Sequence, residues 1–253
     1  MKYNAKVIMS GHTVELYEYE KTIRTGKDCV MDKPVGRKGK RKEGLEWIDE
    51  EARRLRDKEK EKNREDVLRR ARQRIRRLVS SNLGAWDEKT KFITLTFREN
   101  MQDVKAANYE FKKFRQRLEY HLKLKLEYIA VIEFQQRGAV HYHVLFFNLP
   151  YIAHVDLERI WRNGFVKINS VEDPDRVIRY VTKYMTKSND DERLRGEKCY
   201  FTSRGLAKPV EEIIQKEDLN ALREALSPNK IYGFETNSEH LGTICYEKYN
   251  LLK

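Results

Sequence analysis

Two apolar runs separated by a short polar turn constrain the fold of this chain more than any other feature. Residues 127–134 and 140–147 are rich in β-branched and aromatic side chains, and the turn between them contains Gly138. Such a pair predicts an antiparallel β-hairpin, because glycine accepts tight-turn geometry and the flanking residues favour extended backbone. We therefore expect two adjacent strands in the middle of the chain.

Three candidate metal ligands fall on this hairpin. His141 and His143 lie two residues apart on the second strand, so both imidazoles project from one face of the sheet. Glu133 ends the first strand, and hairpin pairing can bring its carboxylate beside the histidines. Two imidazole nitrogens and one carboxylate leave coordination positions open for a substrate oxygen. The pattern indicates a metal site, although a single His-x-His pair on a strand is more often structural.

A second group of reactive side chains lies downstream, on a helix predicted over residues 174–187. Its tyrosines and lysines recur at a spacing that places them on one helical face. A phenolate is a nucleophile that can form a covalent intermediate, and ammonium groups suit phosphate oxygens. Tyrosines at this spacing also occur in packed cores, and lysines on solvated faces. Together with the metal pattern, they suggest metal-assisted attack on a phosphodiester.

At these residues the chain resembles the HUH endonucleases, and most of all the rolling-circle replication initiators of phages and small plasmids. Residues 92–97 are similar to the family's first motif, a strand whose threonines can contact DNA or be plain strand formers. His141 to His143 resembles the second motif, and residues 180–187 resemble the nucleophile helix. Histidines that precede the tyrosines are the order of initiators, whereas conjugative relaxases have the tyrosine first. The similarity covers residues 90–205.

The resemblance implies a divalent metal, Mg²⁺ or Mn²⁺, on His141, His143 and Glu133. It implies a 5′-phosphotyrosine intermediate and an α+β fold, in which a central antiparallel sheet carries the His-x-His strand and is flanked by helices. We favour Tyr184 as the first nucleophile, because it has one lysine beside it and another one turn further along the helix. The expected catalytic residues are Tyr184, Tyr180, Lys183 and Lys187.

The charge balance favours a polyanionic partner. The 253-residue chain has a net charge of +12 and a pI near 9.4, which makes nucleic acid the first candidate. Residues 37–77 hold 18 Lys and Arg against 10 Asp and Glu, a net of +8. Their arginine-rich end, within a helix predicted over residues 45–82, can contact DNA phosphates or form a solvated, salt-bridged face. The expected DNA-binding residues are Arg69, Arg70, Arg74 and Arg77, with Arg204 and Lys208 in a basic loop whose side chains can alternatively cap the turn.

The succession of elements predicts three regions. Residues 1–88 form a basic N-terminal hairpin and helical DNA-binding region, and residues 89–210 form the nuclease core. Residues 211–253 are expected as a C-terminal helix and strand pair that pack on the core. Within the long helix, residues 56–66 contain no apolar side chain, which indicates either a solvated turn or a break between two helices.

Composition also bears on location and partners. No stretch approaches 18 uninterrupted apolar residues and no signal peptide opens the chain, so we expect no membrane association. Three widely separated cysteines fit a reducing cytosol, here that of a bacterial host. The chain contains no phosphate-binding loop of the helicase type, so helicase and polymerase would be supplied by other proteins. The expected partner is single-stranded or origin DNA.

These patterns favour a site-specific single-strand DNA endonuclease and strand transferase that initiates rolling-circle replication. An HUH transposase would share every one of these motifs. Two histidines and a carboxylate also describe a non-haem iron oxygenase, in which the tyrosine–lysine helix and the basic surface would have no role. A DNA-binding regulator with a degenerate site would bind DNA but never cleave it.

Overall fold

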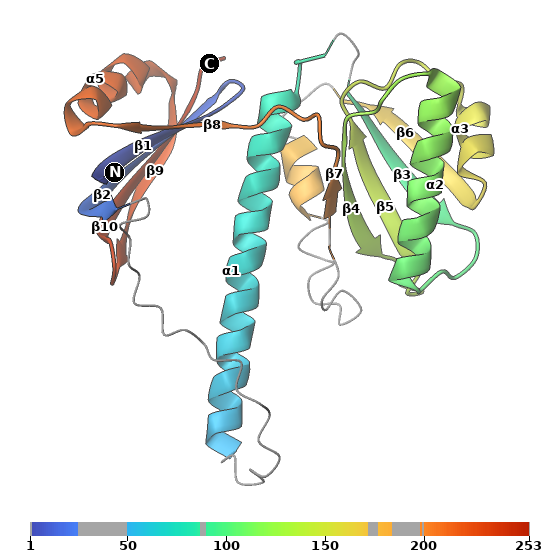
Figure 1. Cartoon of the computed structure of the whole chain (residues 1–253), viewed down its shortest axis with the longest axis horizontal. Helices are drawn as coiled ribbons and strands as arrows, with labels where there is room; N and C mark the ends of the chain where they lie inside the picture. The colour runs from blue at the N-terminus through green and yellow to red at the C-terminus, as the bar shows by residue number, and fades with distance from the viewer. Residues whose placement is uncertain are drawn as a thin grey trace. The chain divides into compact units, whose positions relative to one another are not determined.

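The computed structural model of the chain is shown in Figure 1, and it describes residues 2–24, 50–86, 90–171, 177–183, 198 and 200–252. The chain forms two compact units. One combines Met1–Arg69 with Val210–Lys253, and the other is Arg70–Pro209. Each unit contains an antiparallel five-stranded sheet accompanied by helices. The predicted α+β class is therefore confirmed.

The unit of residues 70–209 is built on a sheet whose strand order is β6-β3-β5-β4-β7. The His-x-His strand β5 is the middle strand, as the resemblance implied. Residues 177–183 are helical, and they follow β6 along the chain. The other elements, in chain order, are β3 (Lys91–Phe97), α2 (Val104–Leu122), β4 (Tyr128–Phe134), β5 (Val140–Phe146), α3 (His154–Trp161), β6 (Gly164–Ser170) and β7 (Tyr200–Thr202).

Strands β4 and β5 form the predicted hairpin. Their pairing places Glu133 directly opposite His141. In the turn, the Gly138 N–H donates to the Gln135 carbonyl at 2.8 Å, and Gly138 has a φ of 87°. This left-handed backbone conformation is open to glycine at little cost and strains most other residues. The turn residue thus determines the register that brings the carboxylate to the histidines.

One face of the sheet is covered by α2 and α3 (Figure 1). Helix α2 begins at the N-cap Asp103, whose carboxylate accepts two backbone N–H bonds, and it buries an apolar stripe that includes Phe111 and Phe114. Tyr142, between the two histidines in sequence, points to this face and is fully buried. Its hydroxyl donates to Asn108 at 2.6 Å. The alternation predicted for residues 141–143 is confirmed.

The opposite face carries a second apolar cluster at one end of the strands. The C-terminal part of α1 (Glu50–Asn82) contributes Ile75 and Val79, and the helix of residues 177–183 contributes Val177 and Val181. They pack against side chains of β3, β4 and β5, among them Phe92. Because side chains alternate along a strand, the histidines project from this same face.

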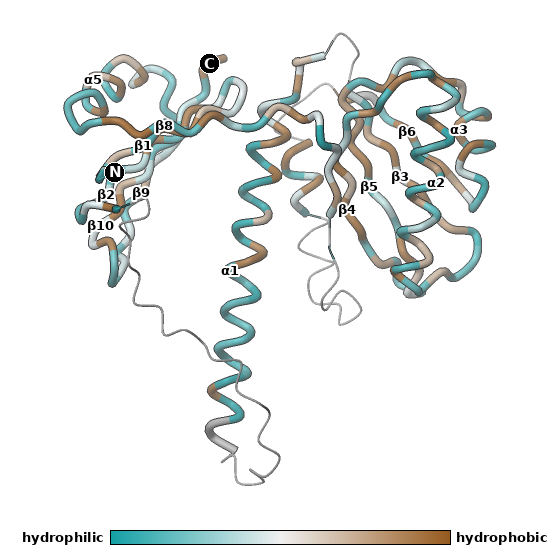
Figure 2. Tube along the Cα trace, in the orientation of Figure 1, coloured by the Kyte–Doolittle hydropathy of each residue, from teal (hydrophilic) through white to brown (hydrophobic). Residues whose placement is uncertain are grey.

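Helix α1 is continuous through residues 56–66, so the stretch without apolar residues is a solvated part of one helix and not a break. Figure 2 shows this middle stretch as predominantly hydrophilic. Ion pairs one turn apart, such as Arg69 with Asp66 at 2.9 Å, lie along it. Among the described residues, no helix is both long enough and apolar enough to span a membrane.

The chain ends form the other sheet, in the order β8-β1-β2-β10-β9. Residues 211–214 were predicted as the start of a helix and are instead part of a strand that pairs with β1. The remaining residues of the prediction form α5, which buries Leu219 in an apolar cluster with β1 and β2. The elements are β1 (Lys2–Ser10), β2 (Thr13–Arg24), β8 (Val210–Ile214), α5 (Lys216–Leu226), β9 (Lys230–Ser238) and β10 (Gly242–Asn250), with a short 3₁₀ turn at Ser227–Asn229.

This sheet groups the chain differently from the three regions expected from sequence. Strand β10 of the C-terminal pair hydrogen-bonds along its length to β2, so both chain ends belong to one sheet. Backbone hydrogen bonds between segments more than 200 residues apart leave no local sequence pattern. Residues 70–82, placed in the N-terminal region from sequence, belong to the unit of residues 70–209.

A charged cluster links α5 to the strands beneath it. Arg223 pairs with Glu18 of β2 at 2.9 Å and with Glu247 of β10, and Lys216 pairs with Glu18 at 3.0 Å. Burial opposes ionisation of Glu18 and Glu247, but the hydrogen bonds and charges of their cationic partners outweigh it. The pKa of each carboxyl is therefore held below its ordinary value. Both carboxylates thus stabilise this unit when ionised.

Candidate functional site

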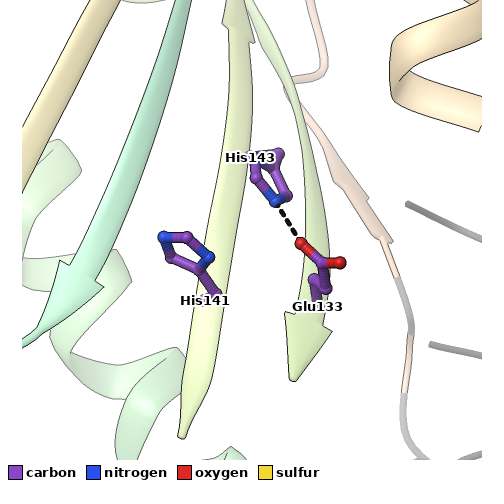
Figure 3. Close-up of side chains that lie close together, drawn as sticks. All are labelled: Glu133, His141 and His143. Carbon is purple, nitrogen blue, oxygen red and sulfur yellow. Dashed lines mark hydrogen bonds and ion pairs between the residues drawn. The ribbon is translucent and has the colours of Figure 1, made fainter. Parts of the chain in front are cut away.

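The three predicted metal ligands converge on one point of the sheet. Figure 3 shows both histidines on β5 and Glu133 on the neighbouring β4. One ligand atom from each residue lies within 4.8 Å of the other two. In the absence of a metal, His143 Nε2 and Glu133 Oε2 are 2.7 Å apart and share a hydrogen bond. A cation between these three atoms would replace that bond with coordination.

Two threonines of β3 contact the outer side of the imidazoles. Thr96 Oγ1 lies 2.6 Å from His141 Nε2, and Thr94 Oγ1 lies 3.3 Å from His143 Nδ1. When His141 Nε2–H donates to Thr96, the lone pair of Nδ1 is left for a metal. Sequence reasoning left these threonines as DNA contacts or plain strand formers. Strand pairing assigns them a role beside the imidazoles, because Thr94 faces His143 and Thr96 faces His141 in adjacent strands.

Burial sets the protonation state of His141. The pKa of this imidazole is lowered to about 4, with burial as the largest cause; the nearby His143 and Arg137 act in the same direction, and Glu133 opposes them. His141 is therefore neutral near pH 7, which is the form that binds a metal. His143 is 5% exposed and His141 is half-buried, so both imidazoles are largely shielded from water.

The helix that carries the candidate nucleophile Tyr180 lies on the same face as the three ligands. Tyr180 meets Phe92 edge-to-face with ring centroids 5.1 Å apart, and Phe92 stacks on His143 at 5.7 Å. One aromatic ring thus separates this phenol from a metal ligand. Tyr180 is 44% exposed, so it is not simply a core residue. Lys183 is exposed at the last described position of the helix.

The second candidate nucleophile cannot be placed in the same way. Tyr184 and Lys187 lie outside the described residues. Their roles remain predictions that rest on the helical spacing from Tyr180.

Strands β3, β4, β5 and β6 and the three candidate ligands fall within a segment that resembles known replication proteins. Residues 90–189 match the family model of the replication-associated protein ORF2. This segment is similar to that family, and the match covers less than half of the chain. No curated protein and no solved structure matches the chain. The matched residues begin just before β3 and include the three candidate ligands and both tyrosines.

The other predicted DNA contacts lie away from the metal ligands. Arg204 and Lys208 are exposed in the loop after β7, which joins the start of β4 through the hydrogen bond from Ser203 N–H to the Tyr128 carbonyl. Glu133 is at the other end of β4, about 17 Å from Tyr128 at roughly 3.3 Å per residue. The basic loop therefore lies at the opposite end of the sheet from the candidate metal ligands.

The predicted arginines of α1 lie mainly on the exposed side of that helix. Arg69, Arg70 and Arg74 are exposed, whereas Arg77 is half-buried. The pairing of Arg69 with Asp66 neutralises part of this charge. Three exposed guanidinium groups within two turns of one helix form a surface suited to phosphate contact.

Sequence reasoning missed a hollow beside the candidate metal ligands. The hollow has a volume of about 750 Å³, and Glu133 and Thr96 belong to its wall. Arg98, Arg137 and Phe165 line the rest of it, together with glutamines of the β4–β5 turn. The signal was present in part, since Arg98 directly follows β3 and Arg137 lies in the hairpin turn. Phe165 gave no signal, because only the pairing of β6 with β3 brings it to the site.

Proposed function

We propose that this protein is a site-specific single-strand DNA endonuclease and strand transferase that initiates rolling-circle replication. The observation that carries the proposal is the convergence of Glu133, His141 and His143 on one sheet face with the helix of Tyr180. It occurs inside a segment of the replication-associated protein ORF2 family. The net charge of +12 supports a polyanionic substrate.

The proposed reaction is a transesterification at one phosphodiester. The phenolate oxygen of Tyr184 attacks phosphorus, and the bond from phosphorus to the 3′ oxygen breaks. The products are a 5′-phosphotyrosine and a 3′ oxygen that takes up a proton to become a free hydroxyl. Reversal of this step by a new 3′-hydroxyl joins two strands. Tyr180, one turn away, would serve as the second nucleophile that resolves the regenerated junction.

Cations of the nucleophile helix have two roles in this proposal. An ordinary phenol has a pKa of about 10, so its deprotonated form needs a nearby positive charge near pH 7. Lys183 and Lys187 are placed by the helical repeat to supply that charge or to hold a phosphate oxygen. The exposed arginines of α1 would bind the DNA backbone without regard to sequence.

The donor set fits a divalent metal held by His141, His143 and Glu133. When bound, Mg²⁺ or Mn²⁺ polarises the scissile phosphate. Imidazole is a softer ligand than carboxylate or water, so two imidazoles favour Mn²⁺ over Mg²⁺ in affinity. The hydrogen bonds between the imidazoles and the β3 threonines, together with the neutral state of His141, would keep both rings ready to coordinate.

The decisive experiment is a search for the covalent intermediate. The protein is incubated with labelled single-stranded origin DNA and Mn²⁺, and a denaturing gel is used to detect a protein–DNA adduct. An adduct that is lost with EDTA supports the proposal. DNA binding without an adduct or nick would contradict it and favour a DNA-binding regulator. Iron binding with oxygen consumption and no DNA cleavage would favour an oxygenase.

Initiator and transposase chemistry are distinguished by where the protein cuts. The match to a replication-associated family favours the replication role. Mapping of the 5′ end of the adduct would place the nick at an origin hairpin for an initiator, and at the ends of a mobile element for a transposase.

A further inference from the structure

The hollow beside the three ligands contains an unusually placed aromatic ring. Phe165 of β6 is 63% exposed, although it lies directly opposite Thr96, the residue that contacts His141. The hollow that it lines also reaches Glu133. Phe165 on β6 is thus separated from His141 on β5 by a single residue, Thr96 on β3.

The backbone holds this ring in place. Gly164, just before Phe165, has a φ of 152°, and a Cβ at this position would lie 2.3 Å from the Thr96 carbonyl oxygen. Only glycine fits so close an approach of β6 to β3. The Arg98 N–H donates to the Asn163 carbonyl at 2.8 Å, which joins the end of β3 to the start of β6. Phe165 thus stands on a rigid strand end, as a stacking surface needs to.

Positive charge surrounds the ring. Arg98 is exposed, and Arg137 is anchored by hydrogen bonds to the carbonyls of Phe97 and Arg98 and to Gln135. Lys167, two residues beyond Phe165 on β6, is exposed and pairs across the sheet with Thr94. Within the described residues, none of these three cations forms an ion pair with a carboxylate. The edge of the hollow therefore offers positive charge to an anionic ligand.

We propose that this hollow binds the single-stranded nucleotide that adjoins the scissile phosphate. Its base stacks on Phe165, and its phosphate lies against Arg98 and Arg137. This inference rests on the proposed function, and it names the substrate form that the site accepts. The ring can take a base only from an unpaired strand, because both faces of a base in a duplex are already stacked.

The size and chemistry of the hollow match this ligand. Its volume of about 750 Å³ lies within the range of about 300–1,000 Å³ found for small-molecule sites. Glu133 is the one acidic residue among those that line it, and its carboxylate would be shared with the metal. Gln135 and Gln136 provide amide groups able to bond base edges. The aromatic ring suits the base, the cations suit the phosphate and the amides suit the base edge, so together these groups match a nucleotide.

The test is a binding cycle without metal, so that no cleavage occurs. The probes are fluorescein-labelled oligothymidylate of about twelve nucleotides and an abasic oligonucleotide of the same length, a site size typical of single-strand binding. Fluorescence anisotropy gives the Kd of each probe for the full-length protein. Phe165→Ala should weaken binding of oligothymidylate by roughly ten-fold, the effect of losing one stacked base. The same variant should leave the abasic probe within about two-fold of the parent, because no base remains to be lost.

Matched variants separate stacking from other effects. Phe165→Trp should retain the affinity, whereas Phe165→Leu should lose it despite a similar apolar bulk. Tyr151→Ala removes another exposed ring of the same unit, 86% exposed, and should change neither Kd. Arg98→Gln should weaken both probes equally and reduce the salt slope by roughly one unit, as expected for a phosphate contact.

Each remaining outcome overturns the proposal. Equal weakening of both probes by Phe165→Ala would mean that the ring supports the fold and does not stack on a base. If Phe165→Ala binds oligothymidylate as tightly as the parent, the hollow does not bind a base and has another ligand, such as a peptide. The proposed nicking function could still stand in that case. If the parent protein binds neither probe at any salt concentration, both the subsite and the proposed function are wrong.

Discussion

Replacement of Thr96 by valine tests whether β3 positions the metal ligands. Valine keeps the shape and the strand preference of threonine but removes the hydroxyl that lies 2.6 Å from His141 Nε2. The imidazole then loses the partner that selects its orientation and tautomer. Loss of one hydrogen bond at a partly buried group costs about 1–3 kcal/mol, and outer-shell partners of metal ligands typically contribute roughly 10–100-fold in affinity. We expect Thr96→Val to raise the Kd for Mn²⁺ by roughly ten-fold or more.

Thr94, two residues earlier on β3, provides a matched control for this measurement. Thr94 Oγ1 is 3.3 Å from His143 Nδ1, a long hydrogen bond, and His143 is additionally held by Glu133. Thr94→Val should therefore weaken Mn²⁺ binding less than Thr96→Val does. Thr96→Ser keeps the hydroxyl and should restore most of the affinity.

Isothermal titration of the full-length protein with Mn²⁺ measures these constants directly, and circular dichroism confirms that each variant is folded. The reasoning is refuted if Thr96→Val binds Mn²⁺ within two-fold of the parent. It is also refuted if serine at position 96 is as weak as valine, because the hydroxyl would then have no part in the effect.

Four further outcomes are expected. The double variant His141→Ala/His143→Ala should abolish nicking and leave DNA affinity in gel shifts largely intact, and full activity would rule out the site. Tyr184→Phe should lose the covalent adduct, whereas Tyr180→Phe should still cleave but fail to join strands. If only Tyr180→Phe lost the adduct, Tyr180 would be the first nucleophile and Tyr184 the second. A variant of α1 in which four arginines are replaced by alanine should bind all DNA sequences more weakly; the residues are Arg69, Arg70, Arg74 and Arg77. The slope of log affinity against log salt concentration should fall by roughly one unit per lost phosphate contact. An unchanged slope would show that this face of the helix is solvated and does not contact DNA. The two carboxylates held by Arg223 have lowered pKa values, so their stabilisation is present above the unfolded carboxylate pKa of about 4.3 and is lost as pH falls through the folded value. Arg223→Met should therefore lower the unfolding midpoint of the terminal unit near pH 7 by more than it does below pH 3, and an equal loss at both pH values would show that only packing was removed.

The candidate metal site was predictable because its three residues follow local rules. Alternation along β5 requires His141 and His143 to share a face, whatever the rest of the fold. The glycine turn then places Glu133 opposite His141, as the hairpin register shows. No knowledge of distant contacts was needed for either step.

The strand Val210–Ile214 shows where local rules fail. The C-terminal helix was expected to begin at residue 211, and the spacing of Val210, Ile213 and Ile214 is compatible with a helix. In the structure these residues hydrogen-bond to β1, about 200 positions earlier in the chain. A short apolar pattern is compatible with both structures, and the available partner strand decides between them.

The amino-acid sequence by itself determined the elements that depend on neighbours in the chain. These include the hairpin, the amphipathic α2 and the shared face of the two histidines, because backbone geometry and side-chain period act within a few residues. Only the tertiary structure decided which residues surround those histidines. Thr96 and Phe165 reach the site through the pairing of β3 with β5 and β6. Hydrogen bonds between strands depend on the whole sheet, so the contacts they create cannot be read from any one segment.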